Sequence, residues 1–566
     1  MSSHTDMDTA ARAAWARCSS SPSLQSTRLA WMDWLSHLAI SPGKQQELAQ
    51  LAASQMLEMA RLAADPNPQQ TPASQDRRFA APAWQQWPFN LMQHGFGLQQ
   101  RWWEAATQGV SGVAPLHQSQ VAFGIRQWLD MLSPSNLLAT NPEVLEKTRA
   151  ENGENLLRGM QHWLDDALRQ MAGQPPAGAE DFVLGRDLAA TPGKVVLRNR
   201  LIELIQYSPS TAEVHPEPLL LIPAWIMKYY VLDLSQHNSL IRYLVEQGHT
   251  VFCISWKNPG ESERDLGMDD YLELGLQAAL DAICAIVPGQ KIHGAGYCLG
   301  GTLLSIGAAA MARDGDERLA SLTLLAAQTD FSEPGEISLF IDDSQVAQLE
   351  AQMADSGYLR GDQMAAAFAL LRARDLVWSR MVNEYLLGER QPMNDLMAWN
   401  ADATRMPARM HSQYLRRLYL NNDLAAGRYP VKDQPVSLTD VRTPVFCVGT
   451  TTDHVAPWPS VYKLHHLCPA QITFVLTRGG HNAGIVSEPG RPRRSYHIAT
   501  RAAGGRHCPV QSWSESATEH AGSWWPAWHE WLCARSAPLQ APPAMGAPAS
   551  GYAPVGEAPG TYVLEK

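Results

Sequence analysis

The sequence contains no apolar run long enough to form a membrane-spanning helix. Its most apolar stretches, such as Leu219–Met227 and Leu319–Ala327, fall well short of the ~20 residues that such a helix requires. The amino terminus, MSSHTDMDTA, is polar and lacks the basic and then apolar layout of a secretory signal. We therefore expect a soluble, cytoplasmic protein without a transmembrane segment.

Cysteine pairs with metal-binding spacing are also missing. The eight cysteines are scattered over most of the chain and none forms a CxxC pair, so we expect neither a disulfide framework nor a zinc motif. Most are expected to be buried thiols, and no metal or other cofactor is implied. Long basic runs are absent as well. The formal net charge of −11 would repel a polyphosphate backbone, which argues against a nucleic-acid partner.

The 566 residues that are present suffice for two or three domains. With 45% hydrophobic and 18% charged residues, the chain falls in the globular class. Residues 1–178 are expected to form a helical N-terminal domain, because apolar residues in Gln45–Ala64 recur near the 3.6-residue period and the run Leu156–Met171 continues the pattern. A polar, proline-containing break is expected at Ala64–Gln75.

Tryptophan is concentrated in this first domain, which holds nine of the nineteen tryptophans in the chain. One interpretation is ordinary core packing. The other is an aromatic surface that meets a partner or an apolar product, because exposed aromatic side chains favour such contacts. The sequence leaves both open.

Beyond the linker Gly173–Gly178, short apolar runs alternate with helical segments. This alternation predicts a mainly parallel, doubly wound α/β sheet in residues 179–535. Strand signals stop over residues 330–439, which are expected to form a helical cap inserted into the sheet domain, and residues 536–566, rich in Ala, Pro and Gly, are expected to be a flexible tail. The expected strands are Val195–Leu197, Leu201–Gln206, Leu219–Ile222, Thr250–Ser255, Lys291–Gly294, Leu322–Ala326, Pro444–Val448 and Ile472–Leu476.

The segment KIHGAGYCLGGTLL, Lys291–Leu304, has the pattern of a nucleophile elbow, G-x-S-x-G, with Cys298 in the place of serine. The turn from strand to helix is so tight that side chains two residues before and after the nucleophile would collide, which explains Gly296 and Gly300. The thiol would stand at a helix N-terminus, where the dipole and free N–H groups favour a thiolate. The pattern therefore predicts an α/β-hydrolase fold with a cysteine nucleophile.

Three other interpretations of this glycine-rich segment are weaker. A dinucleotide-binding fingerprint would need glycine at position 299, where the chain has Leu299. A phosphate-binding Walker loop needs a following Lys-Ser/Thr pair, which is absent. A structural cysteine beside chance glycines is the third, and the downstream sequence argues against it.

The partners of a catalytic triad follow in the order that this fold requires, nucleophile, acid and then histidine. Asp453 comes soon after the predicted strand that ends at Val448, and His481 comes soon after the one that ends at Leu476. His454 is an alternative histidine, but it adjoins the acid and does not follow the last strand. We therefore expect Cys298, Asp453 and His481 to be catalytic.

Groups that would bind the substrate can also be proposed. The backbone N–H of Leu299 is the expected first donor of an oxyanion hole, and Trp225 or Ile226, at the exit of an earlier strand, would supply the second. The Trp225 side chain could equally be part of the core. A basic group that follows the histidine loop is a candidate site for phosphate groups, or else an ordinary solvated surface: Arg491, Arg493 and Arg494.

These motifs, together with others along the chain, resemble those of the polyhydroxyalkanoate synthases of the single-subunit type. The resemblance extends over nearly the whole length. The matching stretches are Asp76–Phe79 with Pro82–Trp84, Ser133–Leu145, Trp225–Leu234, Ile254–Pro259, the GYCLGG elbow, Tyr385–Gly388, Trp399–Asp402, Asp453–Trp458, Ser523–Pro526 and Ala558–Val563.

The resemblance implies an acyltransferase that polymerises (R)-3-hydroxyacyl-CoA into polyester and releases CoA at the surface of cytoplasmic granules. It implies that Cys298 holds the growing chain, that His481 is the general base and that Asp453 is its partner. It also implies a cap that guards the site and activity as a homodimer. No cofactor is implied.

The sequence departs from the family pattern beside the site. Members usually carry an apolar residue and then Asn-Pro-Pro after the catalytic histidine, whereas this chain has Asn482-Ala483-Gly484. The usual Arg-Pro-Asn-Asp before the cap tryptophan is replaced by Arg372–Asp375, Arg-Ala-Arg-Asp. Two other functions stay open, a cysteine-dependent esterase or depolymerase of the same fold and a non-catalytic granule-associated protein.

Overall fold

The computed structural model describes residues 23–64 and 76–566 and divides into two compact units. The hydrolase unit comprises Gly178–Ala365 and Asn394–Lys566, and the helical unit comprises the described residues up to Ala177 together with Ala366–Met393. The polar terminus MSSHTDMDTA and the predicted break Ala64–Gln75, apart from Ala64 itself, lie outside the described residues.

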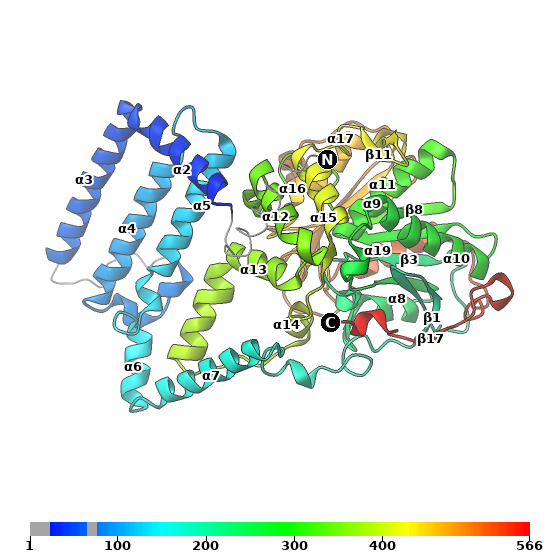
Figure 1. Ribbon diagram of the computed structural model, residues 1–566, viewed down its shortest axis with the longest axis horizontal. Coiled ribbons are helices and arrows are strands. Elements are labelled where there is room, and N and C mark those ends of the chain that lie inside the picture. Colours follow the sequence, from blue (N-terminus) through cyan, green and yellow to red (C-terminus); the bar gives the residue numbers. More distant parts are fainter. Residues whose placement is uncertain (1–22, 65–75) are drawn as a thin grey trace. The chain divides into compact units, whose positions relative to one another are not determined.

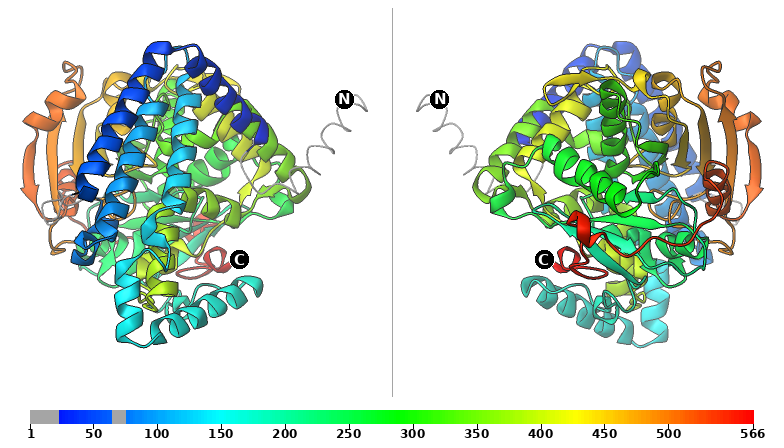
Figure 2. Two further views of the ribbon diagram at one scale, coloured as in Figure 1. Left: turned by 90° about the vertical axis from the view of Figure 1, so that its left-hand side faces the viewer. Right: turned by 90° about the vertical axis from the view of Figure 1, so that its right-hand side faces the viewer.

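The described residues of the N-terminal region are mainly helical, so the prediction of a helical N-terminal region is confirmed (Figure 1). Helices α3, α4 and α5 lie side by side, as the views in Figures 1 and 2 both show. The helices of this region are α2 (Leu24–Ala39), α3 (Pro42–Ala64), α4 (Phe89–Thr107), α5 (Pro115–Met131), α6 (Pro142–Ala150) and α7 (Glu154–Met171).

The tryptophans of this unit divide between the core and the surface. Trp34 and Trp84 are buried, and their indole N–H groups donate to the Ala106 carbonyl at 3.0 Å and to Glu143 at 3.1 Å. Three others are exposed, at 74%, 62% and 55%: Trp87, Trp128 and Trp163. Packing therefore explains some of the tryptophans, whereas an aromatic surface remains an interpretation for the exposed ones.

Part of the expected cap belongs to the helical unit. Residues Ala366–Met393 group with the N-terminal helices, and Arg390 forms ion pairs with Asp165 at 2.9 Å and Asp166 at 2.8 Å on α7. The structure differs here from one continuous cap over residues 330–439. Sequence periodicity shows that a segment is helical, but which neighbour it packs against depends on contacts between distant residues.

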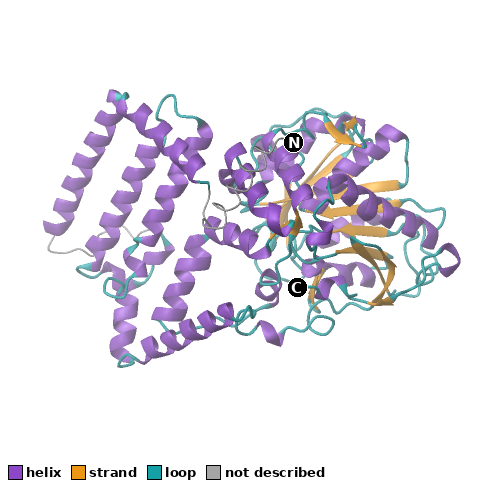
Figure 3. Ribbon diagram, viewed as in Figure 1, coloured by secondary structure: helices purple, strands orange, loops and turns teal. Residues whose placement is uncertain are grey.

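The hydrolase unit contains an eleven-stranded sheet in its described residues, with the order β16-β15-β14-β13-β8-β7-β3-β6-β2-β1-β17. The six strands from β14 to β6 run parallel, and those outside them are antiparallel. Figure 3 shows the strands with helices on both faces. The strands are β1 (Gly193–Arg198), β2 (Ile202–Tyr207), β3 (Leu219–Ile222), β6 (Val251–Trp256), β7 (Ile292–Tyr297), β8 (Leu319–Leu325), β13 (Val445–Thr450), β14 (Ile472–Thr477), β15 (Ser495–Arg501), β16 (Thr518–Ala521) and β17 (Gly556–Glu557).

All eight strands expected from the sequence are present, and the α/β-hydrolase fold is confirmed. Strands β15 and β16 were not expected. They lie at one edge of the sheet, and of their residues only Tyr496 is buried. An edge strand that meets solvent needs no continuous apolar run, so its sequence resembles that of a polar loop.

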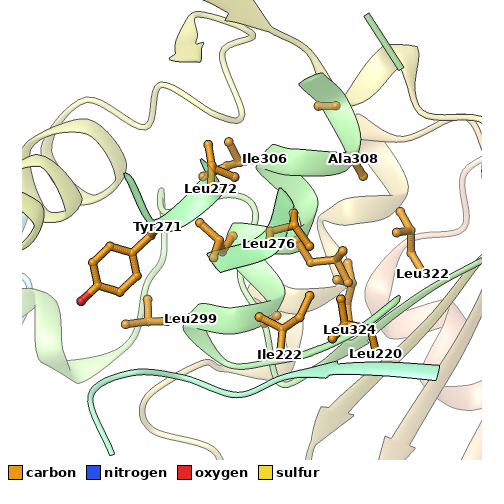
Figure 4. Packing of buried hydrophobic residues seen from close by; sticks show 14 of the residues in the cluster. Leu220, Ile222, Tyr271, Leu272, Leu276, Leu299, Ile306, Ala308, Leu322 and Leu324 are labelled. Carbon is orange, nitrogen blue, oxygen red and sulfur yellow. The ribbon is translucent and has the colours of Figure 1, made fainter. Parts of the chain in front are cut away.

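Helices cover the parallel strands and bury the largest core. Figure 4 shows aliphatic side chains of β3 and β8 packed together with those of α11 and of the helical segment Tyr271–Gln277. The helices of the hydrolase unit and its cap are α8 (Leu240–Glu246), α9 (Met268–Asp270), α10 (Ala278–Ile286), α11 (Leu299–Asp314), α12 (Asp343–Ser356), α13 (Gly361–Leu371), α14 (Asp395–Asn400), α15 (Ala408–Tyr414), α16 (Trp458–Tyr462), α17 (Leu464–Leu467), α18 (Val510–Ser516) and α19 (Trp525–Cys533). Within the described residues, none of the helices has the length and apolar character needed to cross a bilayer.

The C-terminal segment 536–566 differs from the expected flexible tail, because it packs against the sheet. Its strand β17 pairs antiparallel with β1. Glu203, whose side chain is fully buried in β2, accepts hydrogen bonds from the N–H groups of Thr561 and Tyr562 at 2.9 and 3.0 Å. An Ala-, Pro- and Gly-rich composition indicates flexibility only when no partner satisfies the backbone, and here a buried carboxylate does so.

Deletion of residues 560–566 is expected to destabilise the hydrolase unit. Glu203 would keep Arg198, with which it pairs at 2.6 Å, but would lose its donors from the tail, and a buried acceptor left without donors costs about 1–3 kcal/mol. A urea titration of the full-length and shortened proteins measures the difference. The control is Lys194→Ala, which breaks the exposed pair with Glu557 and should cost less than about 1 kcal/mol. Equal effects of the two changes would contradict the role of Glu203.

Candidate active site

Cys298 lies at the turn between β7 and α11 in a strained backbone conformation. Its φ and ψ angles are 52° and −121°, a region that non-glycine residues rarely occupy. The strand ends at Tyr297 and the helix begins at Leu299, so a single residue makes the whole reversal. This geometry is the nucleophile elbow that the sequence predicts.

The glycines of the elbow are required by close backbone contacts. A Cβ atom on Gly300 would lie 1.9 Å from the carbonyl oxygen of Ile222, and one on Gly296 would lie 2.4 Å from the Cα atom of Gly301. Both distances are far below any that real Cβ atoms show. The absence of these side chains lets α11 begin directly against the end of β3.

Asp453 follows β13 and is held by several donors. Its side chain is fully buried, and it accepts hydrogen bonds from the N–H groups of Val455 at 2.9 Å and Ala456 at 2.8 Å and from the Thr450 hydroxyl at 3.0 Å. Burial alone would raise the pKa of Asp453, but His481 and the backbone donors keep that pKa below its usual value. The group is therefore a carboxylate at neutral pH.

His481 follows β14 and joins the other two residues. Its Nδ1 atom lies 2.8 Å from Asp453 Oδ2. Burial disfavours the imidazolium, but the carboxylate of Asp453, the nearby Cys298 sulfur and the hydrogen bond with Asp453 hold the pKa of His481 well above its usual value. The structure thus brings together the three side chains that the sequence analysis selected.

The loop after His481 is fixed by residues that the sequence analysis did not select. The Tyr297 hydroxyl donates to Asn482 Oδ1 at 2.5 Å, and the indole N–H groups of Trp524 and Trp525 donate to the carbonyls of Gly484 and Ile485 at 3.1 and 2.9 Å. Two sequence features could have pointed to these residues. Tyr297 is adjacent to the nucleophile, and the two tryptophans belong to the Ser523–Pro526 motif, for which the sequence shows no chemical role. Asn482, at which the chain departs from the family pattern, therefore helps to position the loop after His481.

His454 lies apart from the pair of Asp453 and His481. Its side chain is 48% exposed, and its Nδ1 atom lies 4.0 Å from Glu336. The hydrogen bond to Asp453 is made by His481, and the catalytic roles of Cys298, Asp453 and His481 stay a prediction.

The expected oxyanion donors lie beside the elbow. Leu299 is the first residue of α11, and Ile226 and Cys298 pack against the core cluster that contains Leu299 and Trp225. The Trp225 side chain is buried against Trp256 and Tyr271, so it is part of the core. The backbone N–H groups of Leu299, Trp225 and Ile226 as oxyanion donors stay a prediction.

Two partly buried tyrosines of the cap lie near the nucleophile and were also missed. The Tyr414 hydroxyl donates to the Tyr419 hydroxyl at 3.2 Å. Burial raises the pKa of both phenols, and the charge of Cys298 contributes to both shifts. The sequence does not show how the cap packs on the sheet, so it gives no signal that these tyrosines lie near the site.

The arginines after the histidine loop are partly engaged within the protein. Arg491 donates to the Val486 carbonyl at 3.3 Å, and Arg494 donates to the Arg478 carbonyl at 2.8 Å. Arg493 is exposed and has a positive φ of 60°. Their role in binding coenzyme A stays a prediction.

Metal ligands do not converge on this site. Among the described residues, the group of His, Cys and acidic side chains close enough to hold an ion is His215, His249 and Cys533, none of which belongs to the triad.

The fold and the elbow define a protein of the α/β-hydrolase class. A profile of the α/β-hydrolase fold matches residues 217–488. Two further profiles, described as the N-terminus of poly-beta-hydroxybutyrate polymerase and as the N-terminal part of that polymerase, match residues 75–244 and 2–44.

Relatives of known name match most of the chain. It is 42% identical over 526 residues to the poly(3-hydroxyalkanoate) polymerase of Methylorubrum extorquens, covering 92% of this chain and 86% of the relative. Identity to the polymerase subunit of Rhizobium meliloti (strain 1021) is 39%, covering 86% and 79%, and to that of Cupriavidus necator 36%, covering 94% and 91%. The chain belongs to the poly(3-hydroxyalkanoate) polymerase family, and it is an acyltransferase.

Substitution of Gly300 by alanine is expected to destabilise the hydrolase unit by about 2–4 kcal/mol, because the new Cβ would overlap the Ile222 carbonyl. Thermal unfolding measures the loss. The matched control is Gly124→Ala on α5, where a Cβ meets nothing within 4 Å and alanine should be neutral or stabilising by up to about 1 kcal/mol. A Gly300→Ala protein as stable as wild type would show that the elbow is not closely packed.

Proposed function

We propose that this enzyme polymerises (R)-3-hydroxyacyl-CoA into polyester with release of CoA, through an acyl-cysteine intermediate on Cys298. The observation that carries the proposal is the hydrogen-bonded pair His481 and Asp453 beside the Cys298 sulfur, all at the carboxyl ends of parallel strands. The names of the relatives, all poly(3-hydroxyalkanoate) polymerases, supply the substrate class.

In the first step the sulfur of Cys298 attacks the carbonyl carbon of the acyl-CoA. His481 takes the thiol proton, and Asp453 orients the imidazole and stabilises its charged form. The carbon–sulfur bond to CoA then breaks, and the leaving thiolate receives the proton. One thioester is exchanged for another, so the step is nearly thermoneutral and the acyl group stays activated.

In the second step the 3-hydroxyl group of another acyl unit attacks the acyl-cysteine. His481 takes the hydroxyl proton, the new ester bond forms, and the Cys298 thiolate leaves and regains a proton. Formation of an oxoester from a thioester is downhill, and this difference drives polymerisation. A serine nucleophile would lose that free energy in the first step. Direct activation of the hydroxyl by Asp453 is the alternative route.

Water has to be kept from the acyl-enzyme, because hydrolysis would compete with chain growth. The cap supplies buried and partly buried side chains near the nucleophile: Phe331 packs against Tyr419, at 4.9 Å between ring centroids, and Tyr419 against Tyr414 at 5.4 Å. A cover that excludes water from the acyl-enzyme fits a polymerase better than a hydrolase. An intact triad is not expected in an inert coat protein.

The enzyme is further proposed to act in the cytoplasm at the surface of its polyester granule, as a homodimer. Support for an apolar surface comes from α7, on which several large apolar side chains are exposed at intervals of three to four residues along the helix: Leu157, Met160, Trp163, Leu164, Leu168 and Met171. Such a face favours contact with an apolar phase. Exposed Arg493 and its neighbours Arg491 and Arg494 remain candidates for the CoA phosphates.

Loss of the triad residues should abolish or strongly reduce release of CoA from (R)-3-hydroxybutyryl-CoA. With Cys298→Ala, release measured with a thiol reagent should fall to background. With His481→Gln it should fall about 10²–10⁴-fold, the usual contribution of a general base. The matched control His454→Gln should leave the rate unchanged. Free hydroxy acid in place of insoluble polyester would assign the protein to the esterases, and CoA release by Cys298→Ala would exclude the mechanism.

The pH profile should move when Asp453 is changed to asparagine. The Asp453 carboxylate raises the pKa of His481, and a general base acts only after it has lost its proton. Activity therefore rises with pH through the pKa of His481, and removal of the negative charge should shift this rising limb to lower pH while lowering the plateau. Initial rates of CoA release across pH test the shift. A limb that stays in place or moves to higher pH would show that Asp453 does not act on His481.

A further inference from the structure

Three histidines and a cysteine converge on one point of the hydrolase unit, outside the site described above. His215 lies in the loop before β3, and His249 lies shortly before β6. His529 and Cys533 are four residues apart on α19, so they share one face of that helix. The backbone N–H of His215 donates to the Gly248 carbonyl at 2.8 Å, which ties the two loops together.

The donor atoms of this cluster are spaced like the corners of a metal coordination sphere. Those of His215, His249 and Cys533 lie within 4.8 Å of one another. The Cys533 sulfur is 3.3 Å from His215 Nε2 and 3.5 Å from His529 Nδ1, and His249 Nε2 is 3.0 Å from His529 Nδ1. In a tetrahedral zinc site, bond lengths near 2.0 and 2.3 Å place neighbouring ligand atoms about 3.3–3.6 Å apart.

The residue types also fit metal ligation. Imidazole nitrogen and cysteine sulfur are the ligand atoms of most structural zinc sites.

His249 carries a further sign of an unmet interaction. Its side chain is nearly fully buried, and within the described residues its Nδ1 atom has no hydrogen-bond partner. Its Nε2 atom faces only the imidazole of His529. A buried polar atom without a partner is costly, and an absent ion or water is a common reason for one.

The cluster and the active site lie at opposite ends of the parallel strands. His215 and His249 come before β3 and β6, whereas Cys298, Asp453 and His481 come after β7, β13 and β14, and all five strands belong to the parallel part of the sheet. In a parallel sheet, the amino ends of all strands lie on one side and the carboxyl ends on the opposite side. An ion bound by the cluster would therefore stabilise the fold without touching the reacting groups.

We propose that His215, His249 and Cys533 bind one zinc ion. Binding replaces the thiol proton of Cys533 by a sulfur–zinc bond, and the proton goes to solvent. Nitrogen and sulfur ligands without a carboxylate select zinc over magnesium or calcium. The ion would connect α19 to the two loops at the amino ends of the parallel strands.

Zinc binding to the full-length protein tests the proposal. The Cys298→Ala background is used, so that the catalytic thiol cannot provide a second soft site. After treatment with a chelator, equilibration with zinc and gel filtration, elemental analysis should give about one zinc per chain. Cys533→Ala should weaken binding by about 10–100-fold or more. Cobalt should give a thiolate-to-metal charge-transfer absorption that Cys533→Ala abolishes, and zinc should raise the thermal midpoint only when Cys533 is present.

The matched control is Cys508→Ser. Cys508 is a second partly buried cysteine, adjacent in sequence to His507, whose ring is tilted against that of His466. Its removal should leave stoichiometry, absorption and thermal shift unchanged. His215→Gln provides a second variant if Cys533→Ala does not fold. The proposal is overturned if the background protein binds no zinc, or if the folded cluster variants bind as much as Cys508→Ser does. Because CoA release is not measured, the result is independent of the proposed function.

Discussion

The close approach of α11 to the end of β3 is the constraint on which the rest of the active site depends. With no Cβ atoms at Gly296 and Gly300, the chain can reverse from strand to helix within the single residue Cys298. That reversal costs backbone strain, shown by a positive φ on a non-glycine residue. Packing of α11 on the sheet offsets the strain. A sulfur atom raised above the strand ends is thereby held without help from any other side chain.

The polar residues around the sulfur depend on this fixed point. Asp453 is buried, charged and supplied with backbone donors, so it can impose one orientation on His481. His481 in turn is confined by the Tyr297–Asn482 contact and by the two tryptophans that hold the following loop. Asp453 therefore restricts the orientation of His481, and the fixed loop after His481 restricts its position. This order favours a site that is organised before substrate arrives, which is where electrostatic catalysis gains most.

The two ends of the parallel strands have different roles. The carboxyl ends hold strained, polar and chemically reactive groups. The amino ends hold the cluster of His215, His249 and Cys533. The C-terminal segment adds a further tie through Glu203. Stability is thus supplied at positions remote from the reacting atoms, and the active site can keep its strain.

The sequence by itself determined the class of fold and the identity of the three side chains that meet at the site. Strand periodicity, the glycine pattern around Cys298 and the order of Asp453 and His481 are local signals, because each reports on a few neighbouring residues. They also located eight strands of the sheet, most of which are buried along their whole length. The exposed strands β15 and β16 carry no continuous apolar run and could not be found in this way.

Tertiary structure alone decided what packs against what. It assigned residues 366–393 to the helical unit, held the Ala- and Pro-rich tail on β1, placed Tyr414 and Tyr419 near the nucleophile and gathered His215, His249 and Cys533 from three distant segments. These contacts join residues separated by tens to hundreds of positions. Their energies depend on burial and on which polar groups remain without partners, and a local pattern of residue types contains neither quantity.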